Sequence, residues 1–101
     1  MTFQEFKKSL QDPQPPDLSP LLVSLWWDGK NKWDQAHDVA QDIESPAGSW
    51  VHAYLHRREG DLGNAAYWYR RAGKSMPSST LEAEWADLVN YFLQEKNKPA
   101  R

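Results

Sequence analysis

The sequence predicts an all-α fold of two antiparallel helical hairpins, with a short helix before them and a C-terminal capping helix after them. Proline and glycine divide the 101-residue chain into segments that begin with a capping residue and end with a helix breaker. Within these segments apolar residues recur at helical intervals, and no stretch alternates apolar and polar residues for long enough to predict a strand. The connections are only a few residues long, which favours antiparallel neighbours, and a chain of this length supports one core.

The first predicted element is a short helix followed by a proline-rich arm, which together make up residues 1–18. Thr2 and Glu5 have the spacing of a capping box, so we expect a helix from Thr2 to about Leu10. Residues 12–20 contain four prolines, which excludes helix through most of this stretch and favours an extended arm. The arm leads into a helical-repeat domain expected at 19–96, and a frayed tail is expected at 97–101.

Five further helices are predicted in the domain itself. The Ser-Pro pairs at 19–20 and 45–46 are start signals, because serine caps a helix and proline fits its first position. Asp61 is a third cap, and Ser79 with Glu82 forms a second capping box. The predicted helices cover residues 20–29, 31–44, 46–60, 61–73 and 79–96, so the two hairpins span 20–44 and 46–73.

Aromatic residues are the unusual part of the composition. Six Trp, four Tyr and three Phe make 13% of the chain aromatic. Several of them fall on the inward stripe of a predicted helix, together with small residues that let helices approach closely. We expect one shared core that includes Trp26, Trp33, Ala53, Ala65, Tyr69 and Trp85.

The second hairpin carries a spacing that is typical of helical repeats. Ala53 is followed twelve positions later by Ala65, and Tyr69, Ala72 and Pro77 follow at intervals of four, three and five. This pattern resembles the small packing residues, second-helix aromatic and terminal proline of a tetratricopeptide repeat. The resemblance is close in the second hairpin and loose in the first, and it implies a helical-repeat protein. The string HAYLHRREGDLGNAAYWYRRAG also resembles the signature of an uncharacterised family of small bacterial and fungal proteins, which implies no known activity.

Charge and composition exclude several classes of function. Twelve Lys and Arg against fourteen Asp and Glu give a net charge of −2, so no bulk positive field is available for nucleic acid or an anionic membrane. The absence of cysteine excludes a disulfide framework, zinc fingers, iron-sulfur clusters and a thiol nucleophile. No apolar run has the length of a membrane helix, and the N-terminus lacks a signal-peptide stretch. We therefore expect a soluble, cytoplasmic protein without a nucleic-acid or membrane partner.

Two histidines offer the clearest metal chemistry. His52 and His56 stand four apart on one predicted helix, which puts both imidazoles on the same face, and Glu59 or the distant His37 would supply a third ligand. Our leading expectation is structural: two partly buried histidines, hydrogen-bonded to backbone or acidic groups, with no metal or cofactor. The alternative is a small enzyme or metal site built on His52, His56, Glu59 and Asp61.

Two further patterns of charged residues are interpreted as structural and not as functional sites. Asp34, Asp38 and Asp42 recur every four residues near His37, which describes a solvated helix face, and no catalytic glycine motif accompanies them. Two arginine doublets, at 57–58 and 70–71, flank the aromatic run at 67–69 in a mixture typical of nucleic-acid binding. Because the net charge is negative, we expect these arginines to form salt bridges to Glu59 and Asp61 and not to bind nucleic acid. We also expect a cation-π contact of Arg71 with Trp68.

The function expected from these patterns is non-catalytic interaction with an unknown protein or peptide partner. In tetratricopeptide-like stacks the first helix of each hairpin lines the concave face, which would place Trp50, Tyr54, Arg57 and Arg58 there. Rings beside guanidiniums suit an extended or acidic peptide segment. An equal alternative is that the chain's own terminal helices cover this face, and a further one is an aromatic-lined pocket for a small ligand.

Overall fold

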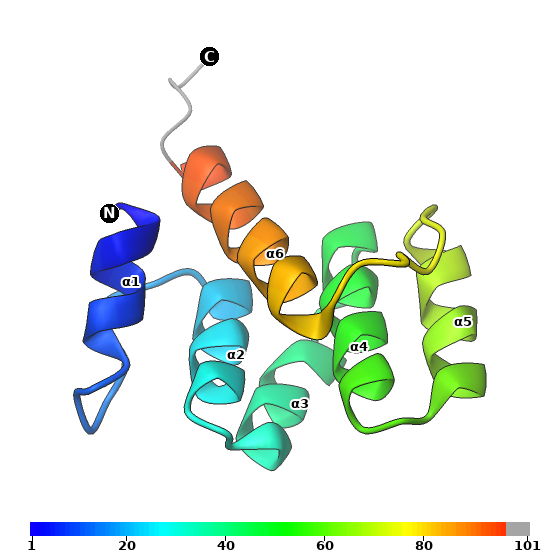
Figure 1. The fold of residues 1–101 in the computed structure, drawn as a ribbon, viewed down its shortest axis with the longest axis horizontal. Helices are drawn as coiled ribbons and strands as arrows, with labels where there is room; N and C mark the ends of the chain where they lie inside the picture. The colour runs from blue at the N-terminus through cyan, green and yellow to red at the C-terminus, as the bar shows by residue number, and fades with distance from the viewer. Residues whose placement is uncertain (97–101) are drawn as a thin grey trace.

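A computed structural model describes residues 1–96, which form six helices and no strand. The all-α prediction is therefore confirmed for this part of the chain (Figure 1). The predicted tail at 97–101 lies outside the described residues. The helices are α1 (Phe3–Ser9), α2 (Pro20–Gly29), α3 (Trp33–Gln41), α4 (Pro46–Arg58), α5 (Leu62–Arg71) and α6 (Leu81–Lys96).

Both predicted hairpins are present. α2 packs against α3, α4 packs against α5, and contacts between α3 and α4 join the two hairpins. α6 contacts α2 and α4 and also contacts α1, so the last helix links the first one to both hairpins (Figure 1). None of the helices in residues 1–96 combines the length and the apolar character needed to cross a membrane.

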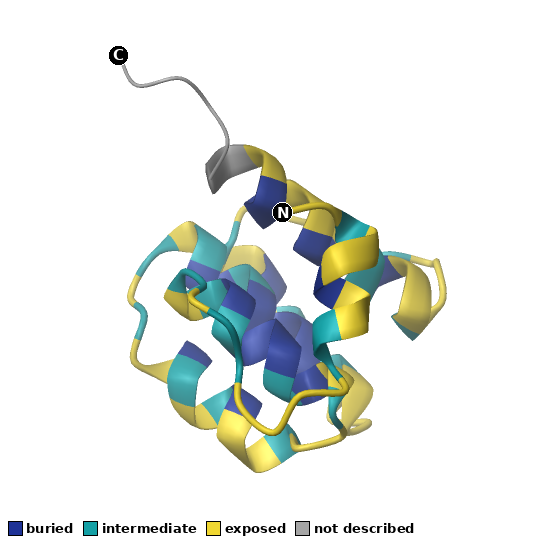
Figure 2. Cartoon of the chain, turned by 90° about the vertical axis from the view of Figure 1, so that its left-hand side faces the viewer, coloured by how far each residue is buried: buried dark blue, intermediate teal, exposed yellow. Residues whose placement is uncertain are grey.

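The core has two parts, whereas one shared core was predicted. The larger part draws side chains from every helix except α5 and includes the fully buried Trp26. The smaller part lies between α4 and α5 and consists of Ala53, Ala65 and Tyr69, all buried as predicted. Figure 2 shows the buried positions gathered inside the bundle and the exposed ones outside it. α5 is therefore held by its partner helix and by polar contacts more than by the main core.

Two tryptophans of the predicted core, Trp33 and Trp85, are only half-buried. Trp33 Nε1 donates to the carbonyl of Leu55 at 2.8 Å, and Trp85 Nε1 donates to the carbonyl of Leu25 at 3.0 Å. Indole is large and carries a polar N–H, so it often packs at the edge of a core with that group bonded.

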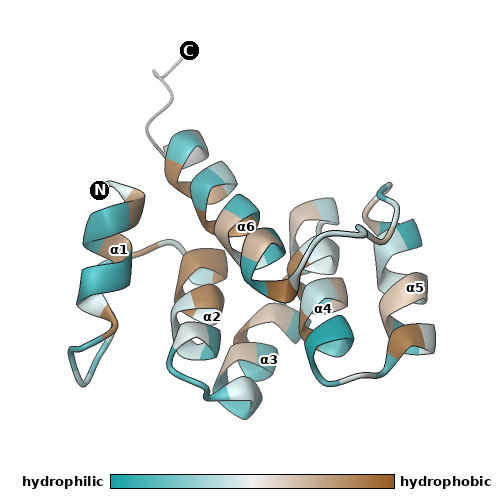
Figure 3. Ribbon diagram, in the orientation of Figure 1, coloured by the Kyte–Doolittle hydropathy of each residue, from teal (hydrophilic) through white to brown (hydrophobic). Residues whose placement is uncertain are grey.

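The N-terminal helix folds back onto the domain, a placement that the sequence left open. Phe6 is fully buried, and the rings of Phe3 and Phe6 each lie 5.8 Å from the ring of Trp85 in α6. At the end of α1, Trp26 Nε1 donates to Ser9 Oγ at 3.1 Å. In Figure 3 α1 is largely hydrophilic and α2 largely hydrophobic, so α1 is attached through a few apolar residues.

The helix predicted at 31–44 is shorter than expected at both ends. Asn31 has a φ of 61°, in the left-handed region that asparagine enters more readily than most residues, so α3 begins only at Trp33. At the other end, a Cβ on Gly48 would lie 2.1 Å from the carbonyl oxygen of Ile43. This close crossing of Ile43 over the start of α4 requires the chain to leave the helix after Gln41.

Most of the predicted caps are confirmed, with one correction. The predicted box of Ser79 and Glu82 is wrong by one residue, because Thr80 Oγ1 accepts from the amide of Ala83 at 3.1 Å. The carbonyl of Ser79 is instead a hydrogen-bond acceptor for Arg57. Side chains that cap as predicted are Thr2 (with Glu5), Ser45 and Asp61, whereas Ser19 occupies the N-cap position of α2 without a side-chain hydrogen bond.

Candidate metal centre

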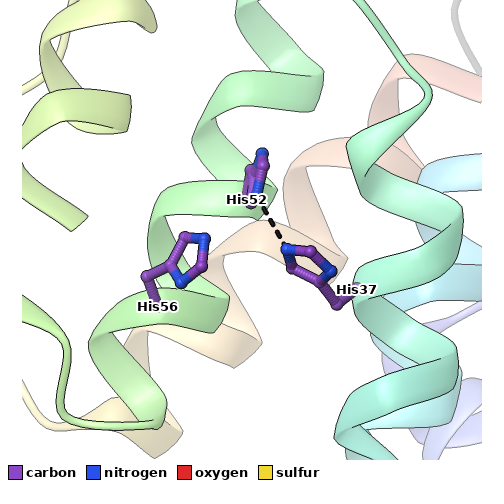
Figure 4. Close-up of side chains that lie close together, drawn as sticks. All are labelled: His37, His52 and His56. Carbon is purple, nitrogen blue, oxygen red and sulfur yellow. Dashed lines mark hydrogen bonds between the residues drawn. The ribbon is translucent and has the colours of Figure 1, made fainter. Parts of the chain in front are cut away.

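Three histidines converge between the two hairpins. His37 comes from α3, and His52 and His56 come from successive turns of α4 (Figure 4). One ligand nitrogen from each ring lies within 4.8 Å of the others. In a tetrahedral zinc site the ligand atoms are 2.0–2.1 Å from the ion and so about 3.4 Å from one another. To hold such an ion, the imidazoles would have to rotate until the three nitrogens reach that spacing.

The two closest rings share one hydrogen. Nε2 of His37 and Nε2 of His52 are 2.9 Å apart, so one ring donates its N–H to the bare nitrogen of the other. His56 is oriented by a different contact, since its Nδ1 lies 3.0 Å from Glu59 Oε1. With Nδ1 engaged, His56 presents Nε2 as its free ligand atom. A carboxylate on the far nitrogen is the usual outer-shell partner of a metal-binding histidine.

Two histidines of this cluster, His37 and His52, are held in the neutral form that binds metals. Burial, together with the neighbouring His56 and His37, lowers the pKa of His52 to about 4. Burial also lowers the pKa of His37, as does His56, against the opposing pull of Asp38, Glu59 and Asp34. At neutral pH each of these two imidazoles therefore carries one N–H and one lone pair, and one of the two Nε2 atoms bears the hydrogen of their shared bond.

Two indole rings pack against the cluster. Trp33 stacks on His37 with ring centroids 4.8 Å apart, and Trp68 of α5 stacks on His52 at 4.0 Å. Trp33 is fixed through its bond to the Leu55 carbonyl. The indoles restrict the imidazole orientations and place fluorescent reporters directly against the cluster.

The structure divides the predicted site residues into two sets. His52 joins His37, whereas Glu59 and Asp61 form an outer set with His56 in which the ligand atoms also lie within 4.8 Å. Glu59 therefore serves as the partner of His56, and the predicted ligand set of His52, His56 and Glu59 is not brought together as one group. The expected burial of both α4 histidines is confirmed, at 7% exposed each. The expected bond to an acid holds for His56 but is wrong for His52, whose partner is His37.

Tyr54 and Arg57, expected to line a concave binding face, are engaged within the chain. Tyr54 is 0% exposed, and its hydroxyl donates to Asp28 Oδ2 at 2.7 Å, so it is not available to a partner. Arg57 Nη1 donates to the buried Glu84 of α6 at 2.8 Å. The alternative in which the terminal helix covers this face therefore describes Arg57, because Glu84 belongs to α6, whereas the partner of Tyr54 lies in α2.

Trp50 and Arg58, the other two residues of that expected face, remain partly accessible. The ring of Trp50 is half-buried, with Lys74 Nζ 4.3 Å from its centroid. Arg58 Nε lies 3.1 Å from Asp28 Oδ1, an ionic contact without an aligned hydrogen bond to that oxygen. Burial raises the pKa of the Asp28 carboxyl, opposed by the Tyr54 hydrogen bond and the Arg58 charge. Arg58 also borders a hollow of about 190 Å³ whose wall includes Lys7, Leu10 and Trp85.

The aspartate face and the arginine doublets have structural roles, as expected, but the arginines pair with other acids than those predicted. Asp34, Asp38 and Asp42 are exposed, as a solvated face requires. Arg57 and Arg58 pair with Glu84 and Asp28 in place of the expected Glu59 and Asp61. The predicted cation-π contact is confirmed, since Arg71 Cζ lies 5.1 Å from the ring of Trp68.

Comparison of the chain with protein-family models, curated proteins and solved structures finds no match in any of the three. The side-chain geometry of the chain is therefore the basis of the function proposed below.

Proposed function

We propose that the chain binds one divalent transition-metal ion of the zinc class through His37, His52 and His56. The observation that carries this proposal is the convergence of three imidazoles within 4.8 Å, one of them with its far nitrogen on a carboxylate. Imidazole suits zinc, copper, nickel and iron, whereas Mg²⁺ and Ca²⁺ prefer oxygen ligands. Three protein ligands leave a fourth tetrahedral position for water or another ligand.

Binding has a proton cost that the arrangement keeps small. The hydrogen shared by the Nε2 atoms of His37 and His52 must leave that position before both nitrogens can ligate an ion. His56 needs no change of contact, because Glu59 already accepts from its Nδ1 when that nitrogen carries the proton. Glu59 thus orients the His56 ring without entering the first coordination shell.

An ion in this position would join the two hairpins. His37 belongs to the hairpin of α2 and α3, and His52 and His56 belong to the hairpin of α4 and α5. Because an ion that binds only the folded state stabilises it by mass action, metal would reinforce the α3–α4 contact. We therefore propose a metal-dependent, non-catalytic role in the first instance, in which the ion fixes the relative position of the hairpins.

Zn²⁺ is expected to bind the tag-free, chelator-treated protein at one equivalent and to stabilise it. At a hundredfold excess of Zn²⁺ over Kd the gain is about 2.7 kcal/mol. Calorimetric titration gives the stoichiometry, thermal melts give the stability, and the visible spectrum of bound Co²⁺ separates tetrahedral from octahedral coordination. His37→Gln is the informative variant, because His37 is half-buried and its replacement spares the core.

The control variants distinguish the three-histidine set from the set of His56, Glu59 and Asp61. His37→Gln should abolish tight binding, Glu59→Gln should weaken it about 10–100-fold as an outer-shell loss, and Asp61→Asn should leave it unchanged. Tight binding that survives His37→Gln but is lost in Asp61→Asn would place the ion on His56, Glu59 and Asp61 and overturn the three-histidine site. Failure to retain any ion at one equivalent would restore the purely structural interpretation.

A second candidate function is the interaction role expected from the sequence, with tetratricopeptide-like repeats that bind an acidic peptide. Its support is the hollow where Arg58 and Lys7 lie beside the apolar Leu10 and Trp85, although the acids Asp28 and Glu82 line the same hollow and Arg58 is paired with Asp28. A labelled peptide rich in glutamate and leucine should bind with an affinity that falls at least about fivefold in Lys7→Gln. Lys8→Gln is the matched control, since Lys8 is exposed on the same helix and does not border this hollow. Equal losses in both variants would identify non-specific attraction and reject the hollow as the site.

A further inference from the structure

We infer that the start of α4, together with Arg71 of α5, forms a binding site for a phosphate group. This inference goes beyond the proposed metal function, because phosphate binding here requires no metal. The site is a hollow of about 240 Å³ bordered by Glu44, Ser45, Pro46, Ser49 and Arg71.

The first observation is an unpartnered hydroxyl at the wall of this hollow. Ser49 is 7% exposed, and within residues 1–96 its Oγ forms no hydrogen bond. The oxygen itself is reached by solvent, so a ligand can replace water as its hydrogen-bond partner. Ser49 borders the hollow, so a ligand placed there would supply the missing acceptor.

The second observation is an arginine without an acidic partner. No carboxylate of the described residues lies within ion-pair distance of Arg71. Its guanidinium is nonetheless held in place, since Nη1 donates to Tyr67 Oη at 3.1 Å and Cζ lies 5.1 Å from the ring of Trp68. An oriented, uncompensated guanidinium offers two parallel donors to a phosphate or carboxylate.

The helix itself supplies the third element. α4 has 13 residues, so its N-terminus carries the positive end of a helix dipole. In the first turn Pro46 has no N–H, and the amides of Gly48 and Ser49 are bonded to Ser45. This leaves the amide of Ala47 as a donor at this end without a partner among the described residues. The helix start, the Ser49 hydroxyl and the Arg71 guanidinium border one hollow, and the N-terminus of a helix is a favourable place for a phosphate group.

One residue acts against an anion here: Glu44 is exposed on the border of the hollow. Because its carboxylate is exposed to solvent and salt, its repulsion of a bound anion is screened. The hollow adjoins the histidine cluster, because Trp68 stacks on His52 at 4.0 Å and Ser49 precedes His52 by one helical turn.

The test is a titration of the chelator-treated protein with inorganic phosphate at constant ionic strength, followed by amide and arginine side-chain NMR signals. Saturable shifts are expected at Ala47, Ser49 and Arg71. Arg71→Gln should weaken binding by about tenfold or more and Ser49→Ala by a few-fold. Arg70→Gln is the matched control, because Arg70 is exposed, adjacent in sequence and absent from the border of the hollow.

A parallel titration with phenyl phosphate distinguishes free phosphate from the phosphate group of a larger molecule. Tighter binding of the ester, with shifts that extend to Tyr67 and Trp68, would assign the site to an organic phosphate. Tighter binding of inorganic phosphate would assign it to the free ion. Equal losses in Arg71→Gln and Arg70→Gln, or shifts that chloride reproduces, would show an adventitious ion only and would overturn the inference.

Discussion

Glu84→Ala is expected to destabilise the fold by roughly 3–5 kcal/mol, as the removal of one partner from a buried ion pair does. Glu84 is 3% exposed and accepts hydrogen bonds from Arg57 Nη1 at 2.8 Å and from the Tyr69 hydroxyl at 2.6 Å and 2.7 Å. Its loss leaves a guanidinium without its countercharge and a buried phenol without an acceptor. Burial and the bond to Glu84 raise the pKa of Tyr69, so the phenol stays protonated and needs that acceptor at every working pH.

Urea unfolding of four variants measures this effect and assigns it. Asp87→Ala on the same helix is the control, because Asp87 is exposed and its loss should change the free energy of unfolding by no more than about 0.5 kcal/mol. Combining Glu84→Ala with Tyr69→Phe should cost less than the sum of the two single changes, since the second removes the phenol that the first leaves unpaired. Additive losses, or a Glu84→Ala variant as stable as the control, would contradict the network.

The sequence predicted the helices well because proline, glycine and capping residues act locally. The Ser-Pro starts and the breakers at Gly29 and Gly60 depend on backbone geometry within one turn, and the structure agrees with them within a few residues. Gly29 itself shows the limit of that reasoning. Its φ is not in the left-handed region, and a Cβ there would lie 3.0 Å from the side chains of Leu10 and Trp85. The need for glycine comes from packing against distant helices, which no local pattern reports.

The sequence predicted two of the three histidines of the candidate site as one group, but not the position of the third. The spacing of His52 and His56 places two imidazoles on one face, and this is visible within a single helix. His37 reaches the other two histidines because α3 packs on α4. The sequence does not give the distance between residues of these two helices. One signal was available, since Trp33 and His37 share the four-residue spacing of the histidine pair and so also share a face. Buried partners from α2 and α6, Asp28 and Glu84, were missed because each acid looks like a surface residue of its own helix.

The free energy of unfolding is expected to fall as the pH is lowered from about 7.5 to 5, with a loss on the order of 2 kcal/mol from His52. The pKa of His52 is about 4 in the folded protein, against an ordinary value of 6.5. Below 6.5 the unfolded chain therefore takes up a proton that the folded chain does not, and this favours unfolding. The contribution is complete above 6.5 and is lost progressively toward 4. His37, whose pKa is also lowered, acts in the same direction.

Chemical denaturation in the presence of chelator at several pH values measures this dependence without a metal contribution. His52→Gln is the matched variant, because glutamine retains a side chain that can hydrogen-bond to His37 but does not titrate. Its unfolding free energy should change less with pH than that of the original chain, by about the 2 kcal/mol assigned to His52. Asp28, whose raised pKa acts in the opposite direction, is present in both proteins and cancels from the difference. Identical pH profiles would mean that the pKa of His52 is the same in the folded and unfolded states, and would contradict the lowered pKa that burial gives this imidazole.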